Sequence, residues 1–366
     1  MKVPLLDLRA QYASIKGEID AAIHRVLDSQ GFILGPEVEA LEREIADYCG
    51  VKHGIGVASG SDALALCVPA LGIGPGDEVI TTPYSFFATA SCIARADAKP
   101  VFVDIDPDTY NIDASLIERV VTARTRAILP VHLYGQCAQM DVLMDIARRR
   151  GLKVLEDAAQ AIGADFRGQR ACSMGDAGIL SFYPTKNLGG LGDAGMVLTS
   201  DDALADKLRL LRAHGMRPKY YHQIVGWNSR MDALQAAGLR AKLPHLEDWV
   251  ARRIAVADGY DRGFAGSGVK VPHRGGTGRH VFHQYVIAVD DRDGLAEHLR
   301  KREIGFELYY PLPLHLQACF SEQGYRQGDL PVAEAAARRT LALPIYPELT
   351  SQQQQYVIDA VREFCG

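Results

Sequence analysis

The spacing of apolar and polar residues changes along the chain. Residues 15–27 and 38–48 carry apolar side chains at helical spacing, and Gly31 and Gly35-Pro36 interrupt the chain between them. From Val51 onward, short apolar runs alternate with amphipathic segments. This part predicts strands over 54–57, 78–81, 100–103, 127–131, 153–156, 179–182 and 196–199, and helices over 61–70, 88–94, 114–121 and 142–149.

Strands that alternate with helices indicate the fold class. We expect an α/β fold in which a mainly parallel seven-stranded sheet is flanked by helices on both faces. A ligand should then lie at the carboxyl ends of the strands. Beyond Arg212 the pattern loosens into a loop over 218–227 and a helix over 231–243. A long helical segment from Glu247 leads into a mixed region. We therefore predict a large domain over 1–246, with the N-terminal helices and the sheet, and a smaller C-terminal α+β domain over 247–366.

Composition narrows the classes of partner and the cellular compartment. The formal net charge of −5 provides no basic footprint for nucleic acid. The seven cysteines are scattered without a Cys-x-x-Cys pair, which favours a reducing compartment over a disulfide framework or a zinc site. Neither a signal peptide nor an apolar run of membrane-spanning length is evident. These features predict a cytoplasmic protein without a metal site.

A lysine in a glycine-flanked turn is the strongest chemical signal. Lys186 follows the predicted strand 179–182 and precedes Gly189-Gly190. Glycines allow a ligand to approach the backbone closely, and a lysine whose pKa is lowered by burial can form a Schiff base with a carbonyl. The segment 190–195 also spells the dinucleotide-binding glycine pattern, but a strand-like run follows it where that motif requires a helix. We therefore reject a nicotinamide site.

Two further segments offer complementary chemistry. Gly60-Ser61 opens the helix 61–70, where free backbone N–H groups and a hydroxyl suit a phosphate, although Ser61 is also an ordinary candidate for an N-cap. Asp157 directly follows the predicted strand 153–156, and a carboxylate there could pair with a cationic ring nitrogen, bind a metal, act as a base or cap a helix. An amine, a carboxylate and a phosphate cradle together indicate pyridoxal 5′-phosphate (PLP). Phe86, just after a predicted strand, could stack on the ring, or could be a core residue.

Several ordered motifs resemble one known family over essentially the whole chain. They are Gly60-Ser61-Asp62-Ala63-Leu64, Gly76-Asp77-Glu78-Val79-Ile80, Val101-Phe102-Val103-Asp104-Ile105-Asp106, Glu156-Asp157-Ala158-Ala159-Gln160, the segment 181–192, and Asn228-Ser229-Arg230-Met231-Asp232 with Gln235-Ala236-Ala237. On these residues the chain is similar to the DegT–DnrJ–StrS sugar-nucleotide aminotransferases, which have the aspartate aminotransferase fold (fold type I).

The resemblance implies a role for each matching residue. Lys186 would hold the cofactor covalently and move the proton during amino transfer, and Asp157 would pair with the ring nitrogen. The remaining cofactor contacts would be Gln160 on the ring hydroxyl, Gly60, Ser61 and Ser181 on the phosphate, and Phe86 on the ring face. Asn228 matches a residue that reaches the phosphate of the neighbouring subunit, and Arg230 matches one that can meet a substrate carboxylate across the interface. The resemblance therefore implies a homodimer with shared active sites.

The resemblance also bears on the substrate. Lys186 stands where related dehydratases carry His, which favours amino transfer, with L-glutamate as the expected donor. The segments 132–137, 181–189 and 310–315 look more like the branch that aminates 3-keto sugar nucleotides than the branch acting on 4-keto sugars. Tyr309 departs from the family, in which His is frequent at this position. Tyr183, Arg230, Tyr310 and His315 are candidate substrate contacts, although His315 could equally be a packed loop residue. The rival hypotheses are a 4-keto specificity and a binding or regulatory protein that has lost catalysis.

Overall fold

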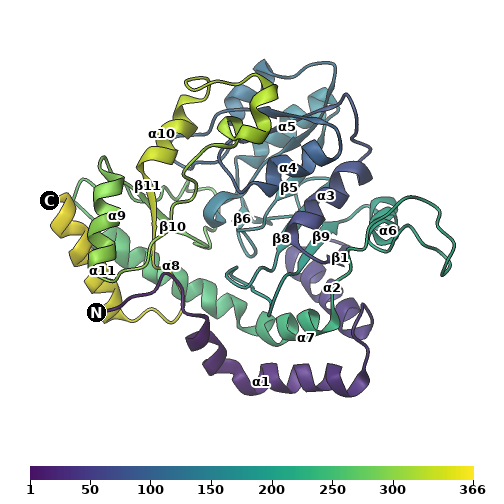
Figure 1. The fold of residues 1–366 in the computed structure, drawn as a ribbon, viewed down its shortest axis with the longest axis horizontal. Helices are drawn as coiled ribbons and strands as arrows, with labels where there is room; N and C mark the ends of the chain where they lie inside the picture. The colour runs from purple at the N-terminus through teal and green to yellow at the C-terminus, as the bar shows by residue number, and fades with distance from the viewer.

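A seven-stranded sheet forms the centre of the larger part of the molecule (Figure 1). The computed structural model describes residues 1–366. The strand order is β1-β9-β8-β5-β4-β2-β3, and only β9 runs against the others. The bounds are β1 His53–Val57, β2 Glu78–Thr81, β3 Lys99–Phe102, β4 Thr125–Leu129, β5 Lys153–Asp157, β8 Ala177–Ser181 and β9 Gly195–Thr199. The predicted, mainly parallel seven-stranded sheet is therefore confirmed.

Helices cover both faces of this sheet because successive strand residues point in opposite directions. In β5, Val154 packs into the core under α2, α5 and α7, whereas Leu155 packs into the core under α3, α4 and α6. The same division separates Leu180 from Ile179 in β8. The helices are α1 Leu8–Ser29, α2 Pro36–Cys49, α3 Gly60–Ala70, α4 Ala88–Arg95, α5 Met140–Arg150, α6 Asp202–Leu211, α7 Ala233–Lys242, α8 Leu246–Gly263, α9 Arg292–Lys301, α10 Pro331–Arg339 and α11 Ser351–Cys365.

The prediction of an α-helix over 114–121 is wrong. The segment Ala114–Arg119 is a 3₁₀ helix that begins at the N-cap Asp113, whose carboxylate accepts a hydrogen bond from the Ser115 N–H. Its two buried residues, Ala114 and Ile117, are three positions apart, which matches the three-residue turn of a 3₁₀ helix. The other short helices of this kind are Leu133–Gly135, Leu243–His245, Leu314–Leu316 and Ala318–Gln323.

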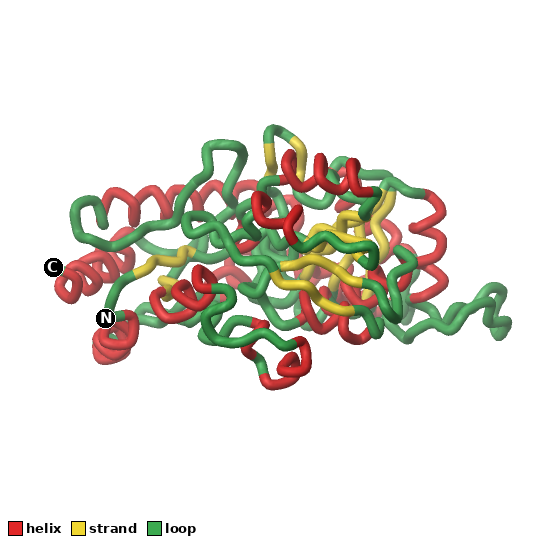
Figure 2. Tube along the Cα trace, turned by 90° about the horizontal axis from the view of Figure 1, so that it is seen from above, coloured by secondary structure: helices red, strands yellow, loops and turns green.

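The C-terminal region has a separate core around a two-stranded antiparallel sheet. Its strands are β10 Tyr285–Ala288 and β11 Thr340–Leu343, and a second small hairpin consists of β6 Asp165–Phe166 and β7 Gln169–Arg170. The β10–β11 sheet lies apart from the large sheet along the long axis of the molecule (Figure 2). The N-terminal residue Val3 pairs with Ile304 and joins this core, so both chain ends lie at the same end of the molecule (Figure 1).

The helix α8 begins at Leu246, close to the predicted domain boundary. Leu246 and Val250 pack into the core of the large sheet, whereas Val256 and Tyr260 pack into the C-terminal core. This helix therefore contributes to both cores, and the division into 1–246 and 247–366 stays a prediction. None of the helices is both long and apolar enough to cross a membrane.

A long loop after α6 extends away from the body of the molecule (Figure 1). It includes the predicted loop 218–227 and exposes several large apolar side chains: Tyr220 is 75% exposed and Val225 is 93% exposed. Isolated exposed apolar residues are normal on protein surfaces, but a cluster of them on a projecting loop is typical of a surface that binds a partner.

Candidate active site

A cavity of 480 Å³ opens at the carboxyl ends of the large sheet. Residues just beyond β1, β2, β5 and β8 line it, and residues 283–284 and 309–310 of the C-terminal region close it from the other side. This is the edge at which ligands bind in open α/β sheets. Among the candidate residues, the cavity brings together Gly60, Ser61, Phe86, Asp157, Gln160, Ser181, Tyr183, Lys186 and Tyr310.

The N-terminus of α3 lies in the wall of this cavity. Ser59 is the N-cap, since its side chain accepts a hydrogen bond of 3.0 Å from the Asp62 N–H, so the N-cap reading of Ser61 is wrong. Gly60 and Ser61 are the first two helical residues, whose N–H groups have no partner within the helix. A Cβ atom on Gly60 would lie 2.6 Å from Cβ of Ser181, so only glycine allows these two parts of the cradle to meet. The arrangement suits a phosphate.

The glycine pattern over 190–195 has a packing role. Gly195 begins β9, and no helix follows, in agreement with the rejection of a nicotinamide site. A Cβ atom on Gly195 would lie 2.4 Å from the carbonyl carbon of Ser59. The glycine therefore lets β9 pass close to the turn that leads into α3.

Asp157 is the buried carboxylate of the site. It ends β5, and its two oxygens accept hydrogen bonds from the Thr89 hydroxyl at 2.8 Å and from the Ala159 N–H at 3.2 Å. Burial raises the pKa of Asp157, while these two hydrogen bonds and the nearby Lys186 act in the opposite direction. A cation placed against this carboxylate would therefore offset part of the cost of burying its charge.

Lys186 supplies the amine. Its side chain reaches the cavity from the turn after β8, and its backbone N–H donates to the carbonyl of Tyr183 at 2.8 Å. Part of the side chain is accessible through the cavity, but the surroundings of the amine are mostly protein. Burial lowers the pKa of Lys186 to about 8, and the charge of Asp157 opposes this shift. About one tenth of the amine is therefore neutral and nucleophilic at pH 7, a fraction about 300 times that of an ordinary lysine.

Gln160 connects the sheet edge to the C-terminal region. Its amide oxygen accepts from the Tyr134 N–H at 2.7 Å, and its amide nitrogen donates to the Tyr310 hydroxyl at 3.0 Å. One amide N–H of Gln160 remains available for a ligand. The backbone around Tyr310 is held in turn by the Tyr84 hydroxyl, which donates to the carbonyl of Tyr309 at 2.8 Å.

Two aromatic side chains in the cavity wall are open to a ligand. Phe86 is 58% exposed, whereas its neighbour Phe87 packs against Phe320 with ring centroids 5.8 Å apart. Phe86 is therefore not a core residue, and its ring can stack on a flat group. Tyr183 also lines the cavity and is 52% exposed, and its contact with a substrate stays a prediction.

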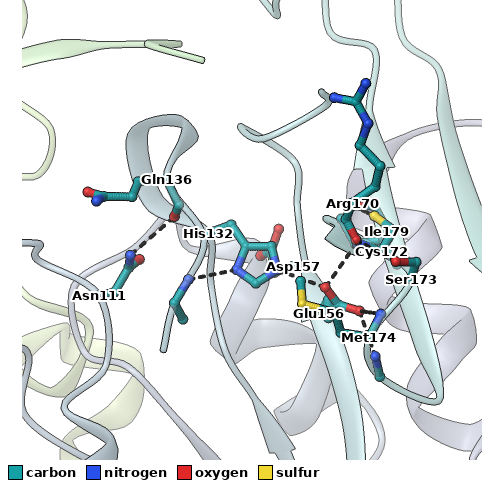
Figure 3. A network of polar contacts seen from close by, with 12 residues as sticks. Asn111, His132, Gln136, Glu156, Asp157, Arg170, Cys172, Ser173, Met174 and Ile179 are labelled. Atoms are coloured by element: carbon teal, nitrogen blue, oxygen red, sulfur yellow. Dashed lines mark hydrogen bonds and ion pairs between the residues drawn. The ribbon is translucent and has the colours of Figure 1, made fainter. Parts of the chain in front are cut away.

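A buried network fixes the strand that carries Asp157 (Figure 3). The neighbouring Glu156 accepts from the His132 ring at 2.9 Å and from three backbone N–H groups, those of residues 172, 174 and 175. The other ring nitrogen of His132 accepts from the Ala138 N–H at 3.1 Å, so the proton of a neutral imidazole must lie on Nε2. The backbone N–H of His132 also donates to the backbone carbonyl of Asp157 at 2.9 Å. The end of β5 is thus held from both sides.

Three candidate residues lie outside this cavity. Asn228 is exposed beside the projecting loop, and the Nε atom of Arg230 is buried without a hydrogen-bond partner. The structure of one chain therefore does not bring these two residues to the cavity, and their expected contacts across a subunit interface stay a prediction. His315 is buried beside Glu334 at 3.2 Å, which agrees with the alternative reading of a packed loop histidine.

Sequence reasoning missed several residues of the site. Ser85, His283 and Gln284 line the cavity, and Thr89 lies directly behind Asp157. Burial and the nearby Lys186 lower the pKa of His283 well below its usual value, so this imidazole is neutral. Ser85 and Thr89 lie on either side of Phe86 just after β2, so the position of this segment after a strand of the site could have indicated them. No local pattern marks His283 or Gln284.

Comparison with known proteins supports one family. The chain matches the DegT/DnrJ/EryC1/StrS aminotransferase family over residues 13–362. A protein of Geobacillus stearothermophilus named a pleiotropic regulatory protein is 52% identical over 100% of this chain and 99% of its own length. A dTDP-3-amino-3,4,6-trideoxy-α-D-glucose transaminase of Streptomyces venezuelae is 47% identical over 99% of this chain and 96% of its own. A UDP-N-acetyl-3-dehydro-α-D-glucosamine 3-aminotransferase of Acidithiobacillus ferrooxidans is 45% identical over 98% and 97%.

Solved structures agree. The DesV protein of S. venezuelae superposes with a TM-score of 0.97 at 47% identity, covering 100% of this chain and 98% of DesV. The NtdA protein of Bacillus subtilis, solved with bound pyridoxamine phosphate, gives a TM-score of 0.90 at 33% identity and covers 99% of this chain and 85% of its own.

The cavity fits the cofactor of this family. It provides an amine of lowered pKa, a buried carboxylate, an exposed aromatic ring and a helix N-terminus whose first residue is Gly60, which has no side chain. These are the groups that a pyridine aldehyde with a phosphate requires. The chain belongs to the DegT/DnrJ/EryC1/StrS aminotransferase family, has fold type I, and is a PLP-dependent sugar aminotransferase.

Proposed function

We propose that this enzyme transfers an amino group from L-glutamate to the 3-keto group of a UDP- or dTDP-linked sugar. The observation that carries the proposal is the joint placement of Lys186, Asp157 and the Gly60–Ser181 cradle in one cavity. The names of the Streptomyces and Acidithiobacillus relatives support the 3-position. The 3-amino sugar would enter lipopolysaccharide, another surface glycan or a glycosylated natural product.

The residues of this chain would divide the work as follows. When bound, PLP supplies an aldehyde that accepts an amine and a cationic ring that withdraws electrons from the neighbouring C–H bond. Asp157 would pair with the ring nitrogen, while Gly60, Ser61 and Ser181 bind the phosphate. Lys186 would hold the cofactor and, as a general base and acid, take a proton from one carbon and return it to another.

We further propose a cytoplasmic homodimer in which each cavity is completed by Asn228 and Arg230 of the second copy. Seven free cysteines, of which five are buried, suit a reducing compartment. Mixing two inactive variants, Lys186→Ala and Arg230→Ala, tests the sharing. In a mixed dimer one cavity combines both native residues, so a random mixture should recover about one quarter of the wild-type rate. A mixture that stays inactive, while gel filtration shows that the subunits exchange, would refute shared sites.

The first test of the reaction is an absorbance spectrum of the purified protein before and after addition of L-glutamate. A visible cofactor band that glutamate converts to the pyridoxamine form, and that Lys186→Ala lacks, is the expected result. Turnover of 3-keto and 4-keto sugar nucleotides then separates the two specificities, and exclusive use of the 4-keto compound would overturn the 3-keto assignment.

The regulatory name of the Geobacillus relative favours one rival, a protein that retains the fold without catalysis. The intact constellation of amine, carboxylate and phosphate cradle supports catalysis instead. A cofactor-loaded protein that reacts with no amino donor would establish the rival.

A further inference from the structure

Two hydroxyl groups form a buried chain that ends on Asp157. Thr89, near the start of α4, is fully buried, and its hydroxyl donates to Oδ2 of Asp157 at 2.8 Å. The Ser85 hydroxyl lies 2.8 Å from that of Thr89, is 3% exposed, and belongs to a residue that lines the cavity. The chain therefore runs from the cavity wall at Ser85 to the carboxylate of Asp157.

The direction of these hydrogen bonds follows from the number of protons available. A carboxylate has none, so Thr89 must donate to Asp157. A hydroxyl has only one proton to donate, so Ser85 must donate to Thr89. A hydrogen bond to a charged acceptor is stronger than one between neutral groups, and each donor in such a chain polarises the next. The arrangement therefore stabilises the charged form of Asp157.

We propose that Thr89 is a positioning residue, oriented by Ser85, that keeps Asp157 charged and aimed at the cofactor ring. Asp157 requires such support because its burial disfavours the charged form and raises its pKa. The Thr89 hydrogen bond is the largest influence in the opposite direction. Thr89 does not line the cavity itself, so it acts only through the carboxylate.

This inference rests on the pairing of Asp157 with the ring nitrogen, and the test separates the two. The probe is pyridoxamine phosphate, compared with its analogue in which a carbon atom replaces the ring nitrogen. The analogue keeps the phosphate and the amine but offers no cation to Asp157. If wild-type protein bound both compounds equally well, the pairing would fail whatever Thr89 does.

The central variant is Thr89→Val, which keeps the shape and removes the hydroxyl. We expect cofactor-free full-length protein to bind pyridoxamine phosphate about tenfold more weakly in this variant, the loss of one hydrogen bond to a charged group. Binding of the carbon analogue should not change. Thr89→Ser should restore most of the affinity. In an Asp157→Asn background the same substitution should have no effect, because the charge that it supports is absent.

Thr81→Val is the matched control. Thr81 is equally buried in β2, but its hydroxyl donates to the carbonyl of Leu129 at 2.8 Å and not to the carboxylate of Asp157. It should leave the preference for pyridoxamine phosphate over the analogue intact. Should Thr89→Val not fold, Ser85→Ala provides the same test with a smaller loss of affinity. Equal weakening of both probes, or an undiminished preference in both variants, would overturn the proposal.

Discussion

The most demanding prediction concerns Glu156, the buried neighbour of Asp157. One carboxylate oxygen accepts from His132 Nε2 and from the Cys172 N–H, both at 2.9 Å. The other accepts from the N–H groups of Met174 at 2.8 Å and Gly175 at 2.7 Å. Glu156 and His132 are both 0% exposed, so water cannot replace any of these four partners.

Replacing Glu156 by Gln keeps the shape but puts an NH₂ group where one oxygen stood. If the amide oxygen faces the backbone of 174 and 175, the NH₂ group faces the Cys172 N–H and the His132 ring. His132 cannot adapt by moving its proton, because its Nδ1 already accepts from Ala138. Two buried donors then lack an acceptor, at about 1–3 kcal/mol each. We expect the free energy of unfolding to fall by about 3–5 kcal/mol.

A second buried pair provides the matched control. Glu334 accepts from His315 at 3.2 Å and from a single backbone N–H, that of Gly328. Here both donors reach the same carboxylate oxygen, Oε1, so the amide oxygen of the Glu334→Gln variant can keep both hydrogen bonds when it takes that place. The two replacements are chemically identical, but this one should cost about 1 kcal/mol or less.

Guanidinium unfolding followed by circular dichroism, with linear extrapolation, measures both variants under the same conditions. A Glu156→Gln variant that is destabilised no more than Glu334→Gln would refute the argument from donors and acceptors. The pyridoxamine phosphate affinity of Glu156→Gln should also fall, since the network holds the end of β5 that carries Asp157.

Three further predictions address the cavity. In the cofactor-free protein, the reaction of Lys186 with an amine-specific reagent should show an apparent pKa of about 8, so its rate should fall as the pH drops through that value. Mapping by mass spectrometry should show that the other, ordinary lysines titrate near about 10. Gly60→Ala should weaken PLP binding at least about tenfold, because its Cβ would press on Ser181, whereas Gly74→Ala, with open space around it, should bind PLP normally in a fluorescence titration. The pKa of His283 is lowered in the folded state, so below about pH 6.5 the unfolded chain takes up a proton that the folded protein does not, and stability should fall. In denaturant titrations, His283→Gln should therefore lose less stability than wild type between about pH 7 and pH 5. An equal loss would contradict this assignment.

The large sheet could be predicted from the sequence because its signals are local. Each of the seven strands is a short apolar run, and the alternation with helices sufficed to indicate a mainly parallel sheet. The segment 114–121 failed because a 3₁₀ helix with two buried residues three apart looks like an amphipathic α-helix over so short a length. The N-terminal residues before α1 were assigned to the large domain, but Val3 packs into the C-terminal core, a contact with residues some 300 positions away that has no local signature.

The sequence by itself also predicted which residues carry the chemistry of the site, since Lys186, Asp157 and Gly60-Ser61 each follow a predicted strand at the sheet edge where ligands bind. Only the tertiary structure decided which groups tune that chemistry. Thr89 contacts Asp157 across 68 residues of sequence, and His283 comes from the C-terminal region. Such contacts depend on how whole elements pack, and a single side chain leaves no periodic trace of the partner it will meet. Local sequence patterns thus indicate which residue types form a site, whereas the pKa values and orientations of those residues depend on tertiary packing.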